Sequence, residues 1–310
     1  MAASAVTTKK PFWTGKRREN MWFYLLVSPW IIGFLLFTVV PILYSIYISF
    51  TEWTMLSSPH WVGFKNFEEM YHDPDIKHSL WITTKYSLIS VPLRMTIALL
   101  LAMLLNEVTR FVGLFRTAFY LPSVVASVAV AVLWQWILNP RFGPFNAMLR
   151  KVGLEGPNWF SDPKYALYAL IIMSSWGVGG EMLIFLAGLK GIPRILYEAA
   201  EIDGANRFQR FRRVTLPMLS PTIFFNLVMA VIGSFQTFDS AFVISTARAG
   251  AIGSPLKSTL FYMLYLYQSA FSNLRMGYAS AMAWLLFVVI VAVTFLINYS
   301  SKKWVFYGDS

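Results

Sequence analysis

Two charged side chains lie inside long apolar stretches of the sequence, where an ion is costly and therefore informative. Arg94 stands beside Pro92 in the middle of one stretch, and Glu181 follows a cluster of glycines in another. Placing such a charge in hydrocarbon costs at least about 2.5–3.5 kcal/mol. For Arg94 we favour a structural ion pair. Glu181 leaves two interpretations open: it lines a polar pathway, or it forms a salt bridge with a partner subunit or a polar contact packed against the glycines.

The sequence lacks the usual catalytic and metal-binding patterns. Its three histidines fall in one loop, and the spacing of His72 with Asp73 and Asp75 fits no helical ligand pattern, so no metal site is expected. No G-x-x-x-x-G-K-[ST], H-E-x-x-H or G-x-S-x-G motif occurs. There are no cysteines, which excludes disulfides and thiolate chemistry. We therefore expect neither an enzyme nor a chain that hydrolyses ATP itself.

Composition indicates the environment that must hold these residues. Of 310 residues, 57% are hydrophobic and 13% are charged, whereas a soluble domain carries about 25% charged residues. An ordinary soluble enzyme and a disordered chain are both excluded, and an all-α integral membrane protein is expected. The net charge of +11 would suggest nucleic acid in a soluble protein. Here it indicates basic loops facing an anionic inner leaflet, with no nucleic-acid partner.

Six stretches are long enough to span a bilayer, for which about 20 apolar residues are needed. They are residues 22–50, 81–105, 117–138, 166–189, 217–238 and 279–299. Lysines and arginines are more numerous on the inner segments if both termini lie inside. This predicts a cytoplasmic tail (1–21), a transmembrane region (22–300) and a second cytoplasmic tail (301–310).

Two segments leave the path of the chain open. The first span is long and contains Pro29 and Pro41, so we expect it to be tilted or broken. Residues 256–272 contain an apolar, aromatic run that is too short for a comfortable span. We favour an interfacial or re-entrant helix on the outer face over a seventh span.

The fifth span presents a face of small and polar residues. Asn226, Ala230, Gly233 and Thr237 recur at helical spacing on one side. Such a stripe suits close helix packing as well as it suits a solute cavity. The sequence leaves these two interpretations open.

The loop between the fourth and fifth spans, residues 190–216, has a distinctive pattern. Residues 196–202 predict a short helix, Asp203 and Gly204 predict its end, and residues 205–214 predict a second short helix rich in arginine. Without further information, the loop could equally be an amphipathic segment whose arginines touch lipid phosphates.

This loop resembles a known signature. The block E-A-A-x-x-D-G-A from Glu198, followed by Leu216-Pro217 and Pro221, is similar to the cytoplasmic signature of permease subunits of binding-protein-dependent ABC importers. Segments along nearly the whole chain, such as Leu114-Phe-Arg-Thr-Ala-Phe-Tyr-Leu-Pro122 and Gly156-Pro-Asn-Trp159, resemble the carbohydrate-uptake branch. Within that branch the chain is similar to the first permease of maltose- and glycerol-phosphate-type systems.

The resemblance implies a fold, partners and a mechanism. The expected fold is the type I ABC importer permease, with six transmembrane helices and a coupling helix between spans 4 and 5. The implied partners are a second permease in a heterodimer, two cytoplasmic ATPase subunits that bind ATP and Mg, and an extracytoplasmic solute-binding protein. The chain itself needs no cofactor and lies in the bacterial cytoplasmic membrane. ATP binding rocks the permeases between inward- and outward-facing states, which is alternating access.

The resemblance also implies two sets of site residues. The set expected to contact the ATPase is Glu198, Ala199, Ala200, Asp203 and Gly204. The set expected to line the solute pathway is Trp176, Gly180, Glu181, Ala230, Ser234 and Thr237. The indole of Trp176 suits a sugar because an aromatic face packs against the C–H face of a pyranose.

Two other functions remain as alternatives. A secondary carrier driven by an ion gradient would need intramembrane acids, for which Glu181 is the candidate. An ABC permease could instead carry a non-sugar solute, such as a phosphorylated polyol or a peptide, and Arg94 keeps an anionic solute open.

Overall fold

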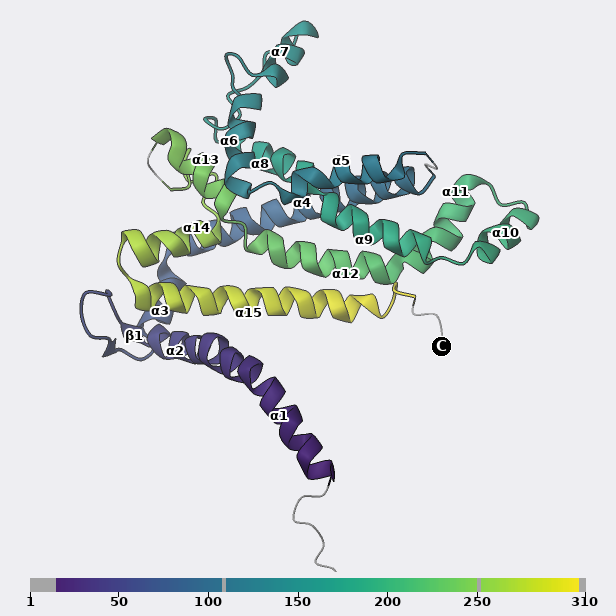
Figure 1. Cartoon of the computed structure of the whole chain (residues 1–310). Helices are drawn as coiled ribbons and strands as arrows, with labels where there is room; N and C mark the ends of the chain where they lie inside the picture. Colours follow the sequence, from purple (N-terminus) through teal and green to yellow (C-terminus); the bar gives the residue numbers. More distant parts are fainter. Residues whose placement is uncertain (1–14, 108–109, 250–251, 307–310) are drawn as a thin grey trace, which may run out of the picture.

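The computed structural model describes residues 15–107, 110–249 and 252–306, and within them the chain is mostly helical (Figure 1). Most of the predicted N-terminal tail and the end of the C-terminal tail lie outside these ranges. The first half contains α1 (Gly15–Phe34), the π-helix η1 (Leu35–Val39), α2 (Val40–Ser49), β1 (Thr51–Glu52), β2 (His60–Trp61), α3 (Lys65–His72), α4 (Pro74–Glu107), α5 (Val112–Val124), α6 (Ser127–Ile137) and α7 (Pro144–Lys151). The second half contains α8 (Ala166–Ser174), the 3₁₀-helix η2 (Ser175–Gly177), α9 (Gly179–Lys190), α10 (Arg194–Ile202), α11 (Arg207–Arg210), the π-helix η3 (Phe211–Thr215), α12 (Leu216–Phe235), α13 (Asp239–Ala249), α14 (Tyr262–Tyr267), the π-helix η4 (Gln268–Ser272) and α15 (Met276–Ser301).

Six membrane spans can be built from these helices, as the sequence predicts. Four helical stretches are individually long and apolar enough: Glu19–Ser49, Pro74–Glu107, Arg207–Thr246 and Met276–Ser301. The pairs α5–α6 and α8–α9 reach that length only together, and they are bent by 97° and 48°. The first span is continuous through both of its prolines, with a π-helical turn in its middle.

The third and fifth spans differ from the simple rods predicted from hydropathy. The predicted third span, 117–138, is divided by Val125 and Ala126, whose extended backbone separates α5 from α6. The predicted fifth span, 217–238, ends as a helix at Phe235, and α13 begins a new, unpredicted helix at Asp239. Hydropathy does not reveal the break between α5 and α6, because apolar residues continue on both sides of it.

Helix α4 forms the centre of the fold, packing against α8, α9, α12 and α14, while α2 packs against α15 (Figure 1). The core contains Met182 and Phe185 of α9 and Leu219 of α12, all almost completely buried. In contrast, α1 leaves the body of the molecule, and few of its side chains are covered (Figure 1).

The segment 256–272 forms a short helix rather than a span. Tyr262 and Leu264 of α14 are fully buried, and α14 packs against α4 and α15. The Tyr262 hydroxyl donates to the Met282 carbonyl at 2.8 Å, and its backbone N–H donates to Thr83 Oγ1 at 2.9 Å. The preference for a short helix is therefore confirmed, but its aromatic face is buried in protein.

Candidate solute cavity and coupling surface

A cavity with two lobes lies between α4, α9 and α12. The first lobe, about 400 Å³, and the second, about 320 Å³, share the side chains of Tyr86, Arg94 and Thr237. Several breaks in the helices meet at the second lobe: the α5–α6 junction, η2 before α9, and the α12–α13 junction. Discontinuous helices at mid-membrane are a common way to build a solute site, because the interrupted backbone supplies polar groups.

The six residues predicted for the solute pathway all line this cavity. Gly180, Glu181, Ala230, Ser234 and Thr237 line the first lobe, and Trp176 and Thr237 line the second. The Ser234 hydroxyl is already engaged within the protein, since it donates to Ser87 Oγ at 2.6 Å and approaches the Val231 carbonyl at 2.7 Å. The structure thus brings the predicted residues together, and passage of a solute along them remains a prediction.

The two intramembrane charges pair with each other. Arg94 of α4 donates from Nη2 to Glu181 Oε1 of α9, in a pair whose side chains are 28% and 17% exposed. The structural ion pair favoured for Arg94 is therefore present. The partner of Glu181 lies within this chain and not on another subunit. The sequence signal for this pair was the presence of opposite charges, Arg94 and Glu181, in two different spans. The sequence alone does not show whether the two side chains lie at the same depth in the membrane.

The second lobe adds polar and aromatic groups that sequence reasoning missed. Asp239, in the first turn of α13, accepts from Ser127 Oγ at 2.7 Å. Trp176 is 38% exposed and meets Trp134 edge-on, with ring centroids 6.4 Å apart. Tyr86 belongs to both lobes. Trp176 itself was predicted, whereas Tyr86 on α4, Ser127 on α6 and Asp239 on α13 are remote from the signature block, and only the folded chain reveals them.

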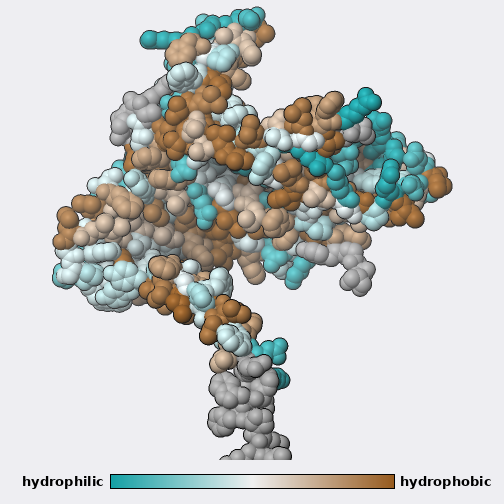
Figure 2. All heavy atoms as spheres, in the orientation of Figure 1, coloured by the Kyte–Doolittle hydropathy of each residue, from teal (hydrophilic) through white to brown (hydrophobic). Residues whose placement is uncertain are grey.

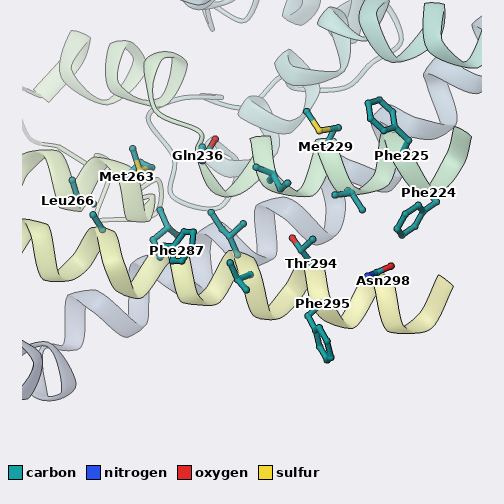
Figure 3. A pocket seen from close by; sticks show the side chains of 16 residues that line it. Phe224, Phe225, Met229, Gln236, Met263, Leu266, Phe287, Thr294, Phe295 and Asn298 are labelled. Atoms are coloured by element: carbon teal, nitrogen blue, oxygen red, sulfur yellow. The ribbon is translucent and has the colours of Figure 1, made fainter. Parts of the chain in front are cut away.

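A larger hollow is apolar and does not suit a sugar. It is a groove of about 1140 Å³ along α12 and α15, with α14 at one end (Figure 3). Phe224, Met229 and Phe287 line it, and its polar members are Gln236, Thr294 and Asn298. None of the described residues that line it is charged. A sugar there would lose water without gaining enough hydrogen bonds, so the groove suits hydrocarbon.

The coupling-signature loop forms two short helices that stand away from the body at one end of the molecule (Figure 1). The predicted helix over 196–202 is confirmed as α10, and Gly204 ends it with φ +74° while the Ala205 N–H donates to the Ala200 carbonyl at 2.9 Å. The second predicted helix, 205–214, is α11 followed by η3, which continues into α12.

The outer surface of this loop combines charge with exposed apolar side chains. Glu198 and Ala199 are exposed, as are Asp203 and Gly204, whereas Ala200 is half-buried. Ile202 is 87% exposed. Figure 2 shows hydrophilic atoms gathered at this end, with an apolar tip. Such a surface is typical of a docking site for another protein.

Together, the fold, the cavity between the spans and the projecting loop define a membrane-embedded transport subunit. Residues 94–306 match the model of the binding-protein-dependent transport system inner membrane components, and the chain belongs to that family. It is therefore a multi-pass membrane component of a transporter rather than an enzyme.

Known proteins of this kind match almost the entire chain. A probable ABC transporter permease, YesP of Bacillus subtilis, is 47% identical over 94% of both chains. An arabinooligosaccharide transport permease, AraP of the same species, is 30% identical and covers 88% of this chain and 86% of its own. A solved bacterial ABC transporter that imports the acidic polysaccharide alginate aligns with TM-score 0.79 and 26% identity, over 93% of this chain and 97% of its own.

Proposed function

We propose that this chain is one of two permease subunits of an importer that receives a sugar from an extracytoplasmic binding protein and passes it through the two-lobed cavity by alternating access. The main support for this proposal is the chemistry of the cavity. Its charged, hydroxyl and amide groups can hydrogen-bond sugar hydroxyls, and Trp176 can pack against a sugar ring. Relatives named for oligosaccharide transport support the same solute class.

Energy enters through the cytoplasmic loop in this proposal. Helix α10 docks in a cleft of a separate ATPase chain, which binds ATP and Mg, and the contact includes Glu198, Ala199, Ala200, Asp203 and Gly204. The exposed apolar side chains around α10 would then be buried on assembly. Because α10 is joined to α12 through α11 and η3, a displacement of α10 is transmitted to a wall of the cavity.

The remaining partners follow from surfaces that this chain leaves uncovered. Helix α1 and the apolar groove of α12 and α15 face outward, where lipid and a second, different permease would cover them. The excess of basic residues on the loops supports a cytoplasmic position for α10 and both termini.

An ion-driven carrier is the less well supported alternative. It depends on Glu181 as an acid that binds and releases the coupling ion. That carboxylate is already neutralised by Arg94, so a transported ion would have to compete with a fixed cation.

The assembly is tested by purifying the tagged chain from its native membrane in mild detergent and identifying the proteins that accompany it. We expect a P-loop ATPase, a second six-span permease and a secreted binding protein. If the chain is repeatedly recovered alone and stable, the importer proposal is wrong.

The cavity is tested with Trp176→Ala in the reconstituted transporter. Loss of one ring-stacking contact, about 0.5–1.5 kcal/mol, should lower the apparent affinity for sugar about threefold to tenfold. Trp136→Ala is the matched control, since Trp136 is 68% exposed on α6 and lines neither lobe. Equal transport affinity in the two variants would assign Trp176 to packing alone.

A further inference from the structure

Arg94 uses only a small part of its hydrogen-bonding capacity within the protein. A guanidinium has five N–H donors, and Arg94 makes one hydrogen bond with the described residues, to Glu181. Its Nε is buried without a partner. An ion in the membrane interior is already costly, and unmade hydrogen bonds of a buried charged group add to that cost. The terminal Nη nitrogens therefore keep N–H donors that no described residue satisfies and that, unlike the buried Nε, are available to a solute in the cavity.

Arg94 also reaches farther into the cavity than its counter-ion. It lines both lobes, whereas Glu181 lines only the first. In the second lobe Arg94 shares the wall with Trp176, Ser123 and Gln236. Glu181 therefore balances the charge of the guanidinium from one side and leaves the other lobe open to a second acceptor.

We propose that the solute is an oligosaccharide that carries a carboxylate, as a uronic acid residue does, and that Arg94 selects it. This rests on the proposed function. The planar fork of a guanidinium matches a carboxylate in a bidentate pair, so one edge of Arg94 can hold the solute while the other keeps Glu181. Trp176 then packs against the sugar ring that bears the carboxylate.

Two other solute chemistries fit these groups less well. A neutral sugar needs donors and acceptors, which amides and hydroxyls such as Asn226, Gln236 and Ser123 supply without the cost of a buried cation. A phosphorylated solute brings a charge of about −1.5 to −2. The single cation of the described cavity is shared with Glu181, so this larger charge would be less well compensated than the single charge of a carboxylate.

Asp239 is a negative charge in the second lobe, and it would repel an acidic solute. Its carboxylate is held by Ser127, and its position in the first turn of α13 lets the helix N-terminus offset part of its charge. Removing that charge with Asp239→Asn should raise uptake of an acidic sugar relative to a neutral one.

The test uses the complete transporter, with both permeases, the ATPase and the binding protein, in proteoliposomes loaded with ATP. The probes are labelled trisaccharides of galacturonate, glucuronate and mannuronate, each paired with its carboxyl-reduced, neutral counterpart. Binding of every probe to the isolated binding protein is measured first, so that selection by the binding protein is distinguished from selection by the permease. We expect uptake of an acidic probe, with its neutral counterpart at least about tenfold slower.

The double variant Arg94→Gln/Glu181→Gln assigns the selectivity to this chain. It removes both charges together, so neither ion is left unpaired and the packing of α4 on α9 is retained. The ratio of acidic to neutral uptake should fall about tenfold or more. Lys85→Gln is the control, because Lys85 lies on the same helix, contacts the Tyr168 ring at 5.6 Å and lines neither lobe.

The outcomes separate the two proposals. Uptake of neutral probes in preference to acidic ones, or an unchanged ratio in the double variant, overturns the acidic-sugar inference and leaves the importer intact. Absence of ATP-dependent uptake of any sugar, including neutral maltotriose and arabinotriose, overturns the proposed function itself.

Discussion

The two ends of this molecule are held together in very different ways. At the end formed by α3, α14 and the start of α15, Asp73 accepts from Tyr265 at 2.5 Å and from Tyr278 at 2.6 Å. The Arg275–Glu69 ion pair joins the start of α15 to α3, and the Lys257–Asp75 pair joins the loop before α14 to the start of α4. At the α10–α11 end, the ion pair among described residues is Arg210–Glu201 at 3.4 Å, and Glu201 is 72% exposed in its side chain.

The difference shows which end is complete within this chain. The α14 end joins segments far apart in the sequence through part-buried hydrogen bonds to Asp73 and through more exposed ion pairs, all of them within this chain. The α10 end exposes apolar side chains and carries few internal contacts, as expected of a surface that is covered on assembly. In the proposed transport cycle, the α14 end moves as a rigid body, and the α10 end is the surface on which the ATPase acts.

The largest expected effect comes from breaking the complete end at Gly277. A Cβ atom on Gly277 would lie 1.9 Å from the Thr51 carbonyl oxygen, which is backbone and cannot move aside easily. Gly277→Val should therefore prevent stable folding, seen as loss of monodisperse protein after detergent extraction. Gly33→Val is the matched control, since its added side chain meets nothing within 4 Å. Normal yield and thermal stability of the Gly277 variant would show that β1 and α15 are not rigidly joined.

The next effect comes from reversing a charge at the incomplete end. Glu198→Arg should abolish uptake and the stimulation of ATP hydrolysis by loaded binding protein, because it places the wrong charge in the proposed ATPase contact. The protein should still fold and insert, since Glu198 is exposed and makes no ion pair in the described chain. Glu155→Arg, an exposed acid on the segment after α7, is the control. Transport at the wild-type rate would remove Glu198 from the coupling surface.

The same contrast separates what the sequence could predict from what it could not. Span count and the α10 helix depend on local composition and a turn-forming Asp203-Gly204 pair, and both were predicted correctly. The Arg94–Glu181 pair and the place of Asp239 in the cavity depend on how distant helices align in depth, which no local pattern encodes. The bend between α5 and α6 was missed because apolar residues continue through it.

The smallest expected effect concerns the stability of the α14 end at low pH. Burial, the largest single influence, raises the pKa of Asp73, but hydrogen bonds from Tyr265, Tyr278 and the backbone N–H groups of Asp75 and Ile76 outweigh it and hold the pKa below its ordinary value. A lowered pKa in the folded state contributes stability above the unfolded value, about 3.9, and loses it as pH falls through the folded pKa.

We therefore expect the melting temperature of the purified transporter to be insensitive to Asp73 between pH 6 and 8, and its Asp73-dependent part to decline below about pH 4. Tyr265→Phe removes one donor, so it should cost about 1.5–3 kcal/mol at neutral pH and move the acid-induced decline to higher pH. Tyr71→Phe is the control, since Tyr71 is 72% exposed and its hydroxyl takes no part in the hydrogen bonds to Asp73. If both variants melted alike at neutral and acid pH, the hydroxyl of Tyr265 would not stabilise this end. The contrast between the two ends would then depend on apolar packing around α14 and not on its polar contacts.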